Sequence, residues 1–123
     1  MPNKTTYDIH ERIFYFVVDV IKFVKPLSRT VDSEIIIKQI IRSVTSMGAN
    51  DQEADGALTK KEFVHRYSIV RKEGKETIFW LKLIGALDKT KYKKTEILKK
   101  EGLEIVAIVS TIISKANRKG MRK

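Results

Sequence analysis

Apolar residues recur at three- and four-residue spacing in four segments of the chain, and this pattern constrains the fold more than any other feature. The segments cover about residues 7–25, 33–55, 60–86 and 95–118. Such spacing places apolar side chains on one face of an α-helix. Since the links are short, neighbouring helices are expected to run antiparallel. The pattern therefore predicts an all-α, antiparallel up-down four-helix bundle in one domain, residues 1–123.

Local signals set the expected ends of these helices. Pro26 ends the first helix, because proline disfavours helical backbone in the residue before it. Either Asp32 or Ser33 can cap the second helix. Thr59 and Glu62 have the spacing of a capping box, in which each side chain satisfies the other residue's backbone N–H. This box predicts where the third helix starts.

Two glycines have different expected roles. Gly74 lies in the apolar row of the third helix, where glycine costs about 1 kcal/mol relative to alanine. Its presence predicts close approach by a neighbouring helix. Gly120 is expected to end the fourth helix and leave a basic tail over residues 119–123.

The first and fourth helices carry apolar faces that are broader than one core needs. The widening residues are Phe14, Val18 and Ile21 in the first helix and Leu103, Val106 and Ile113 in the fourth. Arg12 falls on the expected polar side of the first helix. An excess apolar face predicts that the chain forms a homo-oligomer.

Basic residues dominate the charge, and they are concentrated towards the C-terminus. The chain has 25 Lys and Arg against 15 Asp and Glu, a net charge of +10. Residues 1–57 carry 7 basic and 8 acidic side chains, whereas residues 89–123 carry 11 and 3. Such an imbalance favours polyanionic partners, because bound cations release counterions from phosphates. The alternative is a solvated surface that keeps the protein soluble.

Six basic residues are the candidate phosphate contacts. They are Arg71, Lys72, Lys75, Lys115, Arg118 and Lys119. Lysines also crowd the link before the fourth helix, where Tyr92 is the one aromatic residue, so a stacking platform for bases is only weakly indicated. The sequence contains no recognised module for reading a nucleic-acid sequence.

Residues 51–62 follow the pattern of a calcium-binding loop. Asp51, Glu53 and Asp55 fall on the first three ligand positions, Gly56 on the turn and Glu62 on the bidentate position. Glu53 departs from the pattern, which has Asp or Asn there. The alternative assigns the three acids to a solvated helix end, Gly56 to its stop and Glu62 to the capping box. The pattern alone leaves both interpretations open.

The residues of catalytic chemistry are scarce. The chain has no cysteine and two histidines, His10 and His65, each beside a charged residue and without a nucleophile motif. We therefore expect a non-enzymatic protein without cofactor or metal, with both histidines at the surface or the rim. The most apolar stretch is interrupted by Asp19 and Lys22 and is shorter than the ~20 residues of a membrane span. These features predict a cytoplasmic protein without membrane contact.

Two blocks of sequence resemble a known bacterial family. The first is Ser43-Val-Thr-Ser-Met-Gly-Ala-Asn50 followed by Glu53-Ala54, and the second is Glu76-Thr-Ile-Phe-Trp-Leu81. They are similar to the four-helix bundle family named after proteins encoded in intervening sequences of 23S ribosomal RNA genes, over about residues 7–116. The matched motif residues are Ser43, Ser46, Gly48, Asn50, Glu53 and Trp80.

The resemblance implies assembly and weakens the calcium interpretation. It places Glu53 in the motif of the second helix, and the family is not known for calcium loops. Members typically form homopentameric rings, and a related branch serves diversity-generating retroelements by binding nucleic acid and a reverse transcriptase. Phe79 and Trp80 then become core or subunit-interface anchors.

Two functions follow as expectations. The first is a ring-forming protein that binds RNA or DNA through non-specific phosphate contacts. The alternative is a protein-interaction adaptor, such as the accessory subunit of a retroelement reverse transcriptase. A calcium-responsive helical module is the third and weakest hypothesis.

Overall fold

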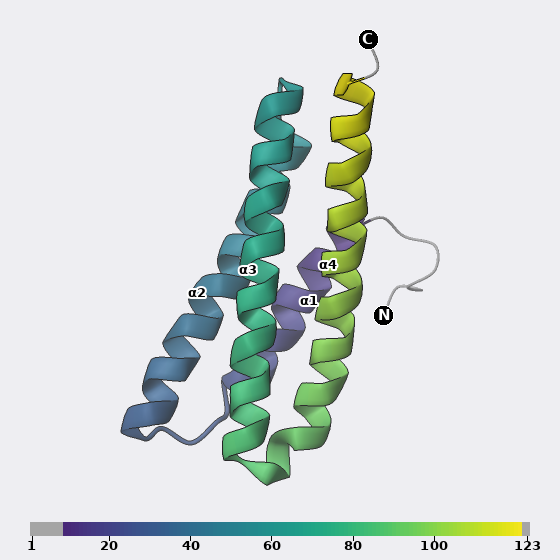
Figure 1. Ribbon diagram of the computed structural model, residues 1–123. Helices are drawn as coiled ribbons and strands as arrows, with labels where there is room; N and C mark the ends of the chain where they lie inside the picture. Colours follow the sequence, from purple (N-terminus) through teal and green to yellow (C-terminus); the bar gives the residue numbers. More distant parts are fainter. Residues whose placement is uncertain (1–8, 122–123) are drawn as a thin grey trace.

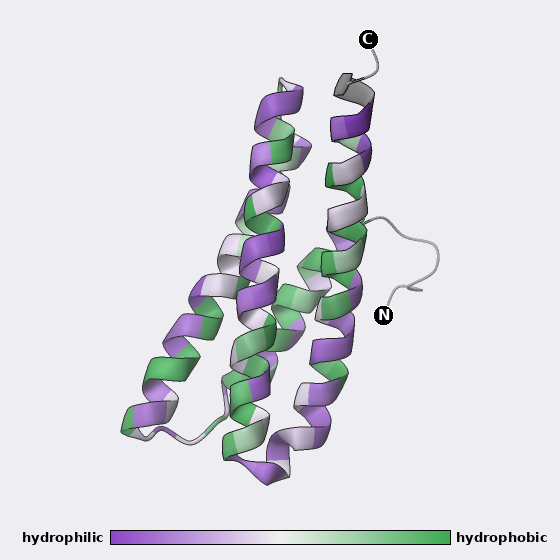
Figure 2. Cartoon of the chain, in the orientation of Figure 1, coloured by the Kyte–Doolittle hydropathy of each residue, from purple (hydrophilic) through white to green (hydrophobic). Residues whose placement is uncertain are grey.

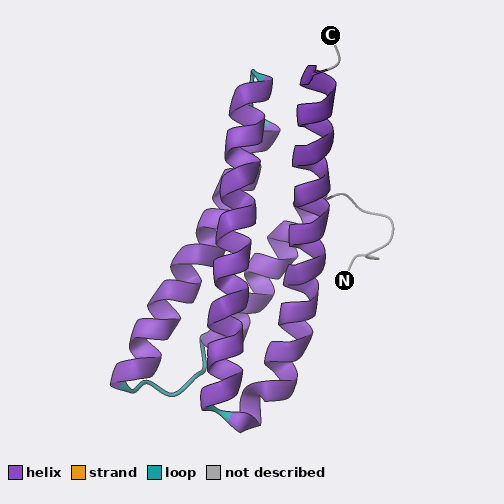
Figure 3. Ribbon diagram, in the orientation of Figure 1, coloured by secondary structure: helices purple, strands orange, loops and turns teal. Residues whose placement is uncertain are grey.

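The computed structural model describes residues 9–121, with side chains through residue 118, and this part of the chain is helical with no strand. The four α-helices are α1 (Ile9–Val24), α2 (Val31–Asp55), α3 (Lys60–Leu87) and α4 (Tyr92–Met121). A 3₁₀-helix, η1 (Lys89–Lys91), precedes α4. Consecutive helices run in opposite directions and are joined by short links (Figures 1 and 3). The all-helical, four-helix prediction is confirmed.

The helices form a closed four-sided arrangement. α3 packs against α2 and α4, and α1 packs against the other sides of the same two helices. No Cα atoms of the described diagonal pairs, α1 with α3 and α2 with α4, lie within 8 Å of each other. α1 has 16 residues, whereas α3 has 28, so α1 covers only part of the bundle's length (Figure 1).

The apolar side chains of all four helices form one shared core. Hydrophobic residues recur along each helix between hydrophilic ones (Figure 2). The largest fully buried side chains are Tyr67, Phe16, Ile13, Ile40, Met47, Leu81, Ile105, Val20, Val24, Val44, Val70 and Val109. Each such apolar side chain contributes about 1.5–3 kcal/mol by leaving water. Helical spacing thus outweighs the strand preference of the many Ile and Val residues. Among the described helices, none is long and apolar enough to cross a membrane.

Gly74 lies where three helices meet. A Cβ atom built on it would lie 2.9 Å from Cγ2 of Val106 on α4 and 3.3 Å from Cε of Met47 on α2. Side chains of both neighbours occupy the space that a larger residue would need. The predicted close approach of a neighbouring helix is therefore confirmed.

The start of α2 differs from its prediction. The cap is Thr30 rather than Asp32 or Ser33, and it forms a true capping box with Ser33. The Ser33 N–H donates to Thr30 Oγ1 at 3.2 Å, and the Thr30 N–H donates to Ser33 Oγ at 2.7 Å. Ser33 takes the place that Glu or Gln usually has in a capping box, so the sequence pattern does not indicate Thr30 as the cap.

The predicted box of α3 is half formed. The Glu62 N–H donates to Thr59 Oγ1 at 3.1 Å, and the Thr59 N–H donates no return bond to the Glu62 carboxylate. Gly56 follows the last residue of α2, as predicted. Thr59 therefore caps α3 without the reciprocal partner.

The ends of α4 lie outside the predicted range. The helix begins at Tyr92 rather than near Thr95, because Asp88 caps η1 and the chain continues from η1 directly into α4. It ends at Met121, so the prediction that Gly120 stops it is wrong. Glycine weakens a helix interior without forbidding it. Of the expected basic tail, residues 119–121 belong to α4, and residues 122–123 lie outside the described part of the chain. Residues 7–8 of the first predicted helix also lie outside it.

Candidate nucleic-acid interface and the contacts behind it

The motif residues of α2 face α3 and bond to it. Ser43 is buried, and its hydroxyl lies 2.7 Å from that of Thr77. Ser46 donates to Glu73 at 3.3 Å. One turn further, Arg66 Nη1 donates to Asn50 Oδ1 at 3.0 Å. These polar groups join two helices.

Trp80 belongs to the same network. Its indole N–H donates to Glu76 Oε2 at 3.0 Å, and Arg42 donates to the same carboxylate oxygen. The hydrogen bond from Trp80 is the main reason that the pKa of Glu76 lies below its usual range. The hydrogen bond and positive charge of Arg42 lower this pKa further, whereas desolvation raises it. Arg42 also pairs with Glu73 at 3.4 Å. An arginine and a tryptophan thus keep Glu76 anionic between α2 and α3.

The two remaining motif residues, Gly48 and Glu53, have different surroundings. A Cβ atom on Gly48 would lie 3.2 Å from Cγ2 of Val17, so this glycine lets α1 approach α2. Glu53 is exposed, and its carboxylate lies 4.0 Å from Arg66 Nη2. Of the six motif positions, four thus contact a neighbouring helix closely, Trp80 bonds to Glu76 within α3, and Glu53 lies at the rim.

Asp51 is buried rather than solvated, which corrects the expectation of an exposed helix end. Its side chain is 1% exposed. Tyr67 donates its hydroxyl to Asp51 Oδ1 at 3.0 Å, and His10 Nδ1 lies 2.9 Å from the same oxygen. His10 Nε2 lies 3.3 Å from Asp55 Oδ1, so this histidine lies between two carboxylates. His10 is 31% exposed and so lies at the rim, as expected, whereas its two carboxylate partners were not predicted; His65 is exposed.

This geometry also overturns the calcium-loop interpretation. Residues 51–55 are the last turn of α2, and only residues 56–59 link it to α3, so no twelve-residue loop is present. The oxygens of Asp51 already bond to His10 and Tyr67. Within the described residues, no group of three or more His, Cys, Asp or Glu side chains could hold a metal ion. The match to the loop pattern arises from a helix end followed by a cap.

Arg12 is buried, although the helical pattern places it on the polar side of the first helix. Its guanidinium donates to both carboxylate oxygens of Glu101, at 2.7 and 3.1 Å, and to Glu104 at 2.8 Å. The hydrogen bonds to Glu101 raise the pKa of Arg12 most, and the bond to Glu104 raises it further. Desolvation acts in the opposite direction and lowers this pKa. Glu101 and Glu104 are spaced three residues apart, which puts them on one helix face and could have indicated a cationic partner.

The predicted phosphate contacts are accessible. Lys72, Lys75, Lys115 and Arg118 are exposed, and Arg71 is half-buried. None of these five forms an ion pair with another described residue. The side chain of the sixth candidate, Lys119, lies outside the described part of the structure.

The candidates do not form one cluster. Residues 71–75 of α3 lie beside Val106 of α4, as the contact of Gly74 shows. Lys115 follows Val106 by nine residues, which is about 13 Å along the helix axis and two and a half turns. It therefore lies on the side of α4 that faces away from α3. The structure separates the α3 candidates from those at the end of α4.

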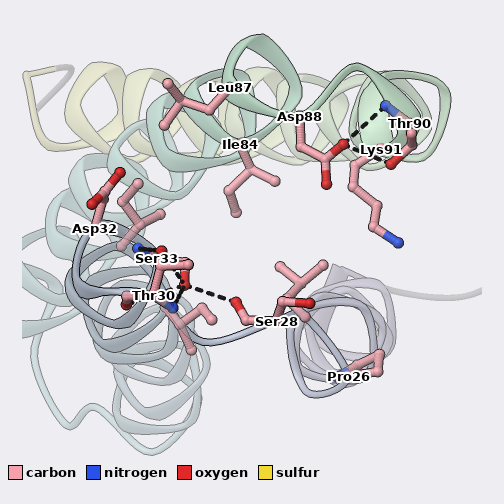
Figure 4. A pocket seen from close by; sticks show the side chains of 13 residues that line it. Pro26, Ser28, Thr30, Asp32, Ser33, Ile84, Leu87, Asp88, Thr90 and Lys91 are labelled. Carbon is pink, nitrogen blue, oxygen red and sulfur yellow. Dashed lines mark hydrogen bonds between the residues drawn. The ribbon is translucent and has the colours of Figure 1, made fainter.

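Another basic group gathers at the opposite end of the bundle. We call residues 88–94 the basic end; they contain four lysines and one aspartate. Lys89, Lys93 and Lys94 are exposed, and the Tyr92 ring is 53% exposed. A pocket of about 530 Å³ opens beside these residues, between η1, the last turn of α3 and the start of α2 (Figure 4). The sequence indicates the lysines but not the pocket, because its walls come from distant segments.

Arginine and lysine serve different purposes in this fold. The carboxylates between helices pair with Arg12, Arg42, Arg66 and His10. By contrast, Lys99, which pairs with Glu96 at 2.8 Å, is the one lysine in an ion pair among the described residues. The charge surplus of the chain is therefore carried mainly by unpaired lysines.

The comparisons with known proteins agree with the motif. The model of the family described as 23S rRNA-intervening sequence protein matches residues 5–111. The chain belongs to this family. A solved structure from Bacteroides thetaiotaomicron, described as a protein of unknown function from the S23 ribosomal protein family, superposes with a TM-score of 0.79. It is 29% identical, and the match covers 86% of this chain and 95% of that one. No curated protein matches the chain.

Membership explains why the two sequence blocks lie on facing helices. In this member of the 23S rRNA-intervening sequence protein family, Ser43 and Ser46 on α2 reach Thr77 and Glu73 on α3. Trp80 lies one turn further along α3. The resemblance inferred from these residues is confirmed, and it carries no assignment of a biochemical role.

Proposed function

We propose that this protein is a non-enzymatic, homopentameric ring that binds RNA or DNA through non-specific phosphate contacts. The observation that carries the proposal is the separation of charges described above. Carboxylates between helices pair with arginine and histidine, whereas all described lysines except Lys99 are unpaired, and most of them are exposed. Exposed cations gain affinity for phosphates by releasing counterions.

The proposed contacts are the five described candidates and Lys119. Arg71 and Lys75 are one helical turn apart and share a face of α3. Lys115, Arg118 and Lys119 likewise recur at three- and four-residue spacing on α4. Two separate basic patches suit a long polyanion better than a single small anion. Repetition around a ring brings the total to about +50 from five chains of +10, which strengthens the field.

An exposed apolar band supports assembly. We define the band as Val31 and Ile35 on α2 and Phe79 and Leu87 on α3, which are 79%, 58%, 53% and 63% exposed. The antiparallel contact of Ser43 with Thr77 brings the first turns of α2 beside the last turns of α3. Phe79 also packs edge-on against the half-buried Trp80. Exposed apolar side chains with an aromatic anchor are typical of subunit interfaces.

Fluorescence anisotropy with a labelled single-stranded RNA tests nucleic-acid binding. The test variant combines Arg71→Gln, Lys72→Gln and Lys75→Gln, and the control removes the same charge at the exposed Lys22, Lys25 and Lys38. We expect the test variant to bind more weakly and to lose about 2 from the slope of log affinity against log salt. Equal affinities for both variants would reject this assignment of residues, and no binding by the wild type would reject the function.

The adaptor role remains the second candidate, and the apolar band favours it. The exposed side chains of the band can pack against a different protein, for example a reverse transcriptase, as well as against a second copy of this chain. Light scattering coupled to size exclusion separates the two. A ring-sized mass that falls for Phe79→Lys supports assembly through the band. A monomeric wild type would leave the band to another protein.

A further inference from the structure

We propose that the pocket at the basic end is a nucleotide site, in which the base lies on an apolar floor and Lys91 binds the phosphate. This inference rests on the proposed function, nucleic-acid binding. It names the part of the nucleic acid that the basic end recognises. The same chemistry is present in a free mononucleotide and at the end of a single strand. The experiment below distinguishes these two sources.

The pocket is built by segments that only the fold brings together. Residues 26–30 between α1 and α2 form one wall, and the last turn of α3 with η1 forms the other (Figure 4). Its volume of about 530 Å³ falls within the range of small-molecule sites. A cleft of this size at the junction of four segments can enclose a base and its sugar.

The floor is apolar. Ile36, Ile37 and Ile84 line it and retain 7%, 4% and 7% of their accessible surface. Leu87, also in the lining, is 63% exposed at the rim. The flat face of a heterocyclic base is suited to such a surface, because it loses contact with water while its polar edge stays free.

Asp88 supplies an acceptor for that polar edge. Its Oδ1 accepts the Thr90 N–H at 3.0 Å and the Thr90 hydroxyl at 2.6 Å. Its other oxygen accepts no hydrogen bond from a described residue and points into the pocket (Figure 4). The bonds from Thr90 hold the pKa of Asp88 below its usual range, so the group is a carboxylate at neutral pH. A base with an exocyclic amino group can donate to it.

Lys91 supplies the cation. Its side chain is half-buried and forms no ion pair with a described residue, and its ammonium group points into the same space (Figure 4). Lys89, Lys93 and Lys94 are exposed within three residues of Lys91 in sequence, so this end of the bundle has a positive field that attracts a phosphate.

The apolar floor, the Asp88 carboxylate and the Lys91 ammonium group together select among ligand classes. A purely anionic ligand is repelled by Asp88 and Asp32, both of which line the pocket. A purely apolar ligand leaves Lys91 and Asp88 without partners. A nucleoside phosphate carries amino donors at one end, an apolar ring face, and a phosphate at the other end, and so matches all three features.

Methyl-selective NMR of the full-length protein tests the site directly. The probes are the four 5′-mononucleotides, inorganic phosphate, and a 5′-phosphorylated single-stranded oligonucleotide. We expect mononucleotides with an amino group to shift the methyl signals of Ile36, Ile37 and Ile84, and inorganic phosphate to leave them unmoved. Equal shifts with phosphate alone, or no shifts with any mononucleotide, would overturn the proposal.

A charge-matched pair of variants assigns the phosphate contact. Lys91→Gln is expected to weaken mononucleotide binding about tenfold, and Lys91→Arg to restore most of it. Lys60→Gln removes the same charge at the opposite end of α3 and is expected to change nothing. Equal affinities for Lys91→Gln and Lys60→Gln would contradict the role of Lys91.

The oligonucleotide separates this inference from the proposed function. If the oligonucleotide binds without moving the floor methyl signals, the pocket inference fails and phosphate binding elsewhere stands. If mononucleotides move these signals and the oligonucleotide does not bind, the pocket takes free nucleotides and the proposed function fails. Shifts with both probes support both proposals.

Discussion

The two diagonal helices of the bundle, α1 and α3, are held in different ways. α3 has 28 residues and packs against α2 and α4 along its length, with Tyr67, Val70 and Leu81 in the core. α1 has 16 residues and adds two polar anchors to its apolar row. His10 joins it to Asp51 of α2, and Arg12 joins it to Glu101 of α4.

The difference shows how a short helix can be fixed in place. α1 buries at least as many apolar side chains as the longer α3, and its directional bonds to carboxylates add to this apolar row and set its position. The stabilisation from apolar burial does not change with pH, whereas the stabilisation from an ion pair requires that both partners are charged. Because α1 contacts α2 and α4 over a shorter length than α3 does, we expect α3 to unfold only with the whole bundle, and α1 to separate from the bundle at lower cost.

The largest effect is expected from truncating the core of α3. Leu81→Ala removes a fully buried side chain and is expected to lower the free energy of unfolding by about 2–5 kcal/mol, because a cavity remains. Urea unfolding, followed by circular dichroism, measures the loss. Hydrogen exchange should accelerate in all four helices, and acceleration confined to α3 would contradict the common role assigned to this helix.

The anchor of α1 on α4 comes next. Arg12→Met keeps an apolar stem but removes the guanidinium that pairs with Glu101, whose side chain is 14% exposed, at an expected cost of about 3 kcal/mol. Hydrogen exchange should accelerate first in α1. Arg29→Met is the matched control, since its pair with Glu34 is exposed and 4.0 Å long, and less than about 0.5 kcal/mol is expected. Equal effects of the two variants would show that burial of Arg12 does not matter.

The anchor of α1 on α2 is weaker. His10→Ala leaves the buried Asp51 with the Tyr67 hydroxyl and is expected to cost about 1–3 kcal/mol. His65→Ala removes an exposed histidine and serves as the control. Limited proteolysis at neutral pH should cut near α1 faster only in His10→Ala. If proteolysis is unchanged, the bonds of His10 do not fix α1.

The smallest effect concerns the α2–α3 contact at low pH. The pKa of Glu76 is lowered in the folded protein, so its contribution to stability is complete above its ordinary pKa of about 4.5 and is lost as pH falls through the lower folded pKa. Because Glu76 is 31% exposed, less than about 1 kcal/mol is expected. Urea midpoints of wild type and Glu76→Gln at neutral and acid pH check this. The two curves should converge at acid pH, and a constant difference would contradict it.

The core was predictable from the sequence because apolar spacing is a local property. The row through Ile13, Phe16 and Val20 identifies the buried face of α1 without any knowledge of its neighbours. The same holds for Gly74, whose place in an apolar row already implies a close neighbour.

The polar contacts were not predictable in this way. Arg12 lies on the polar side of an isolated helix, and only the position of α4 makes it a buried partner of Glu101. Asp51 fits a metal-loop pattern equally well until His10 and Tyr67 are placed beside it. The basic candidates share this limit, since helical spacing shows which of them share a helix face but not how the helices place them relative to each other.

The central claim is that a basic ring binds nucleic acid through phosphates. Light scattering coupled to size exclusion, with and without a short single-stranded RNA at low and moderate salt, tests it most directly. The account predicts a mass near five chains that gains RNA at low salt and releases it at moderate salt. A ring that never gains RNA, or a monomer in every condition, would contradict it.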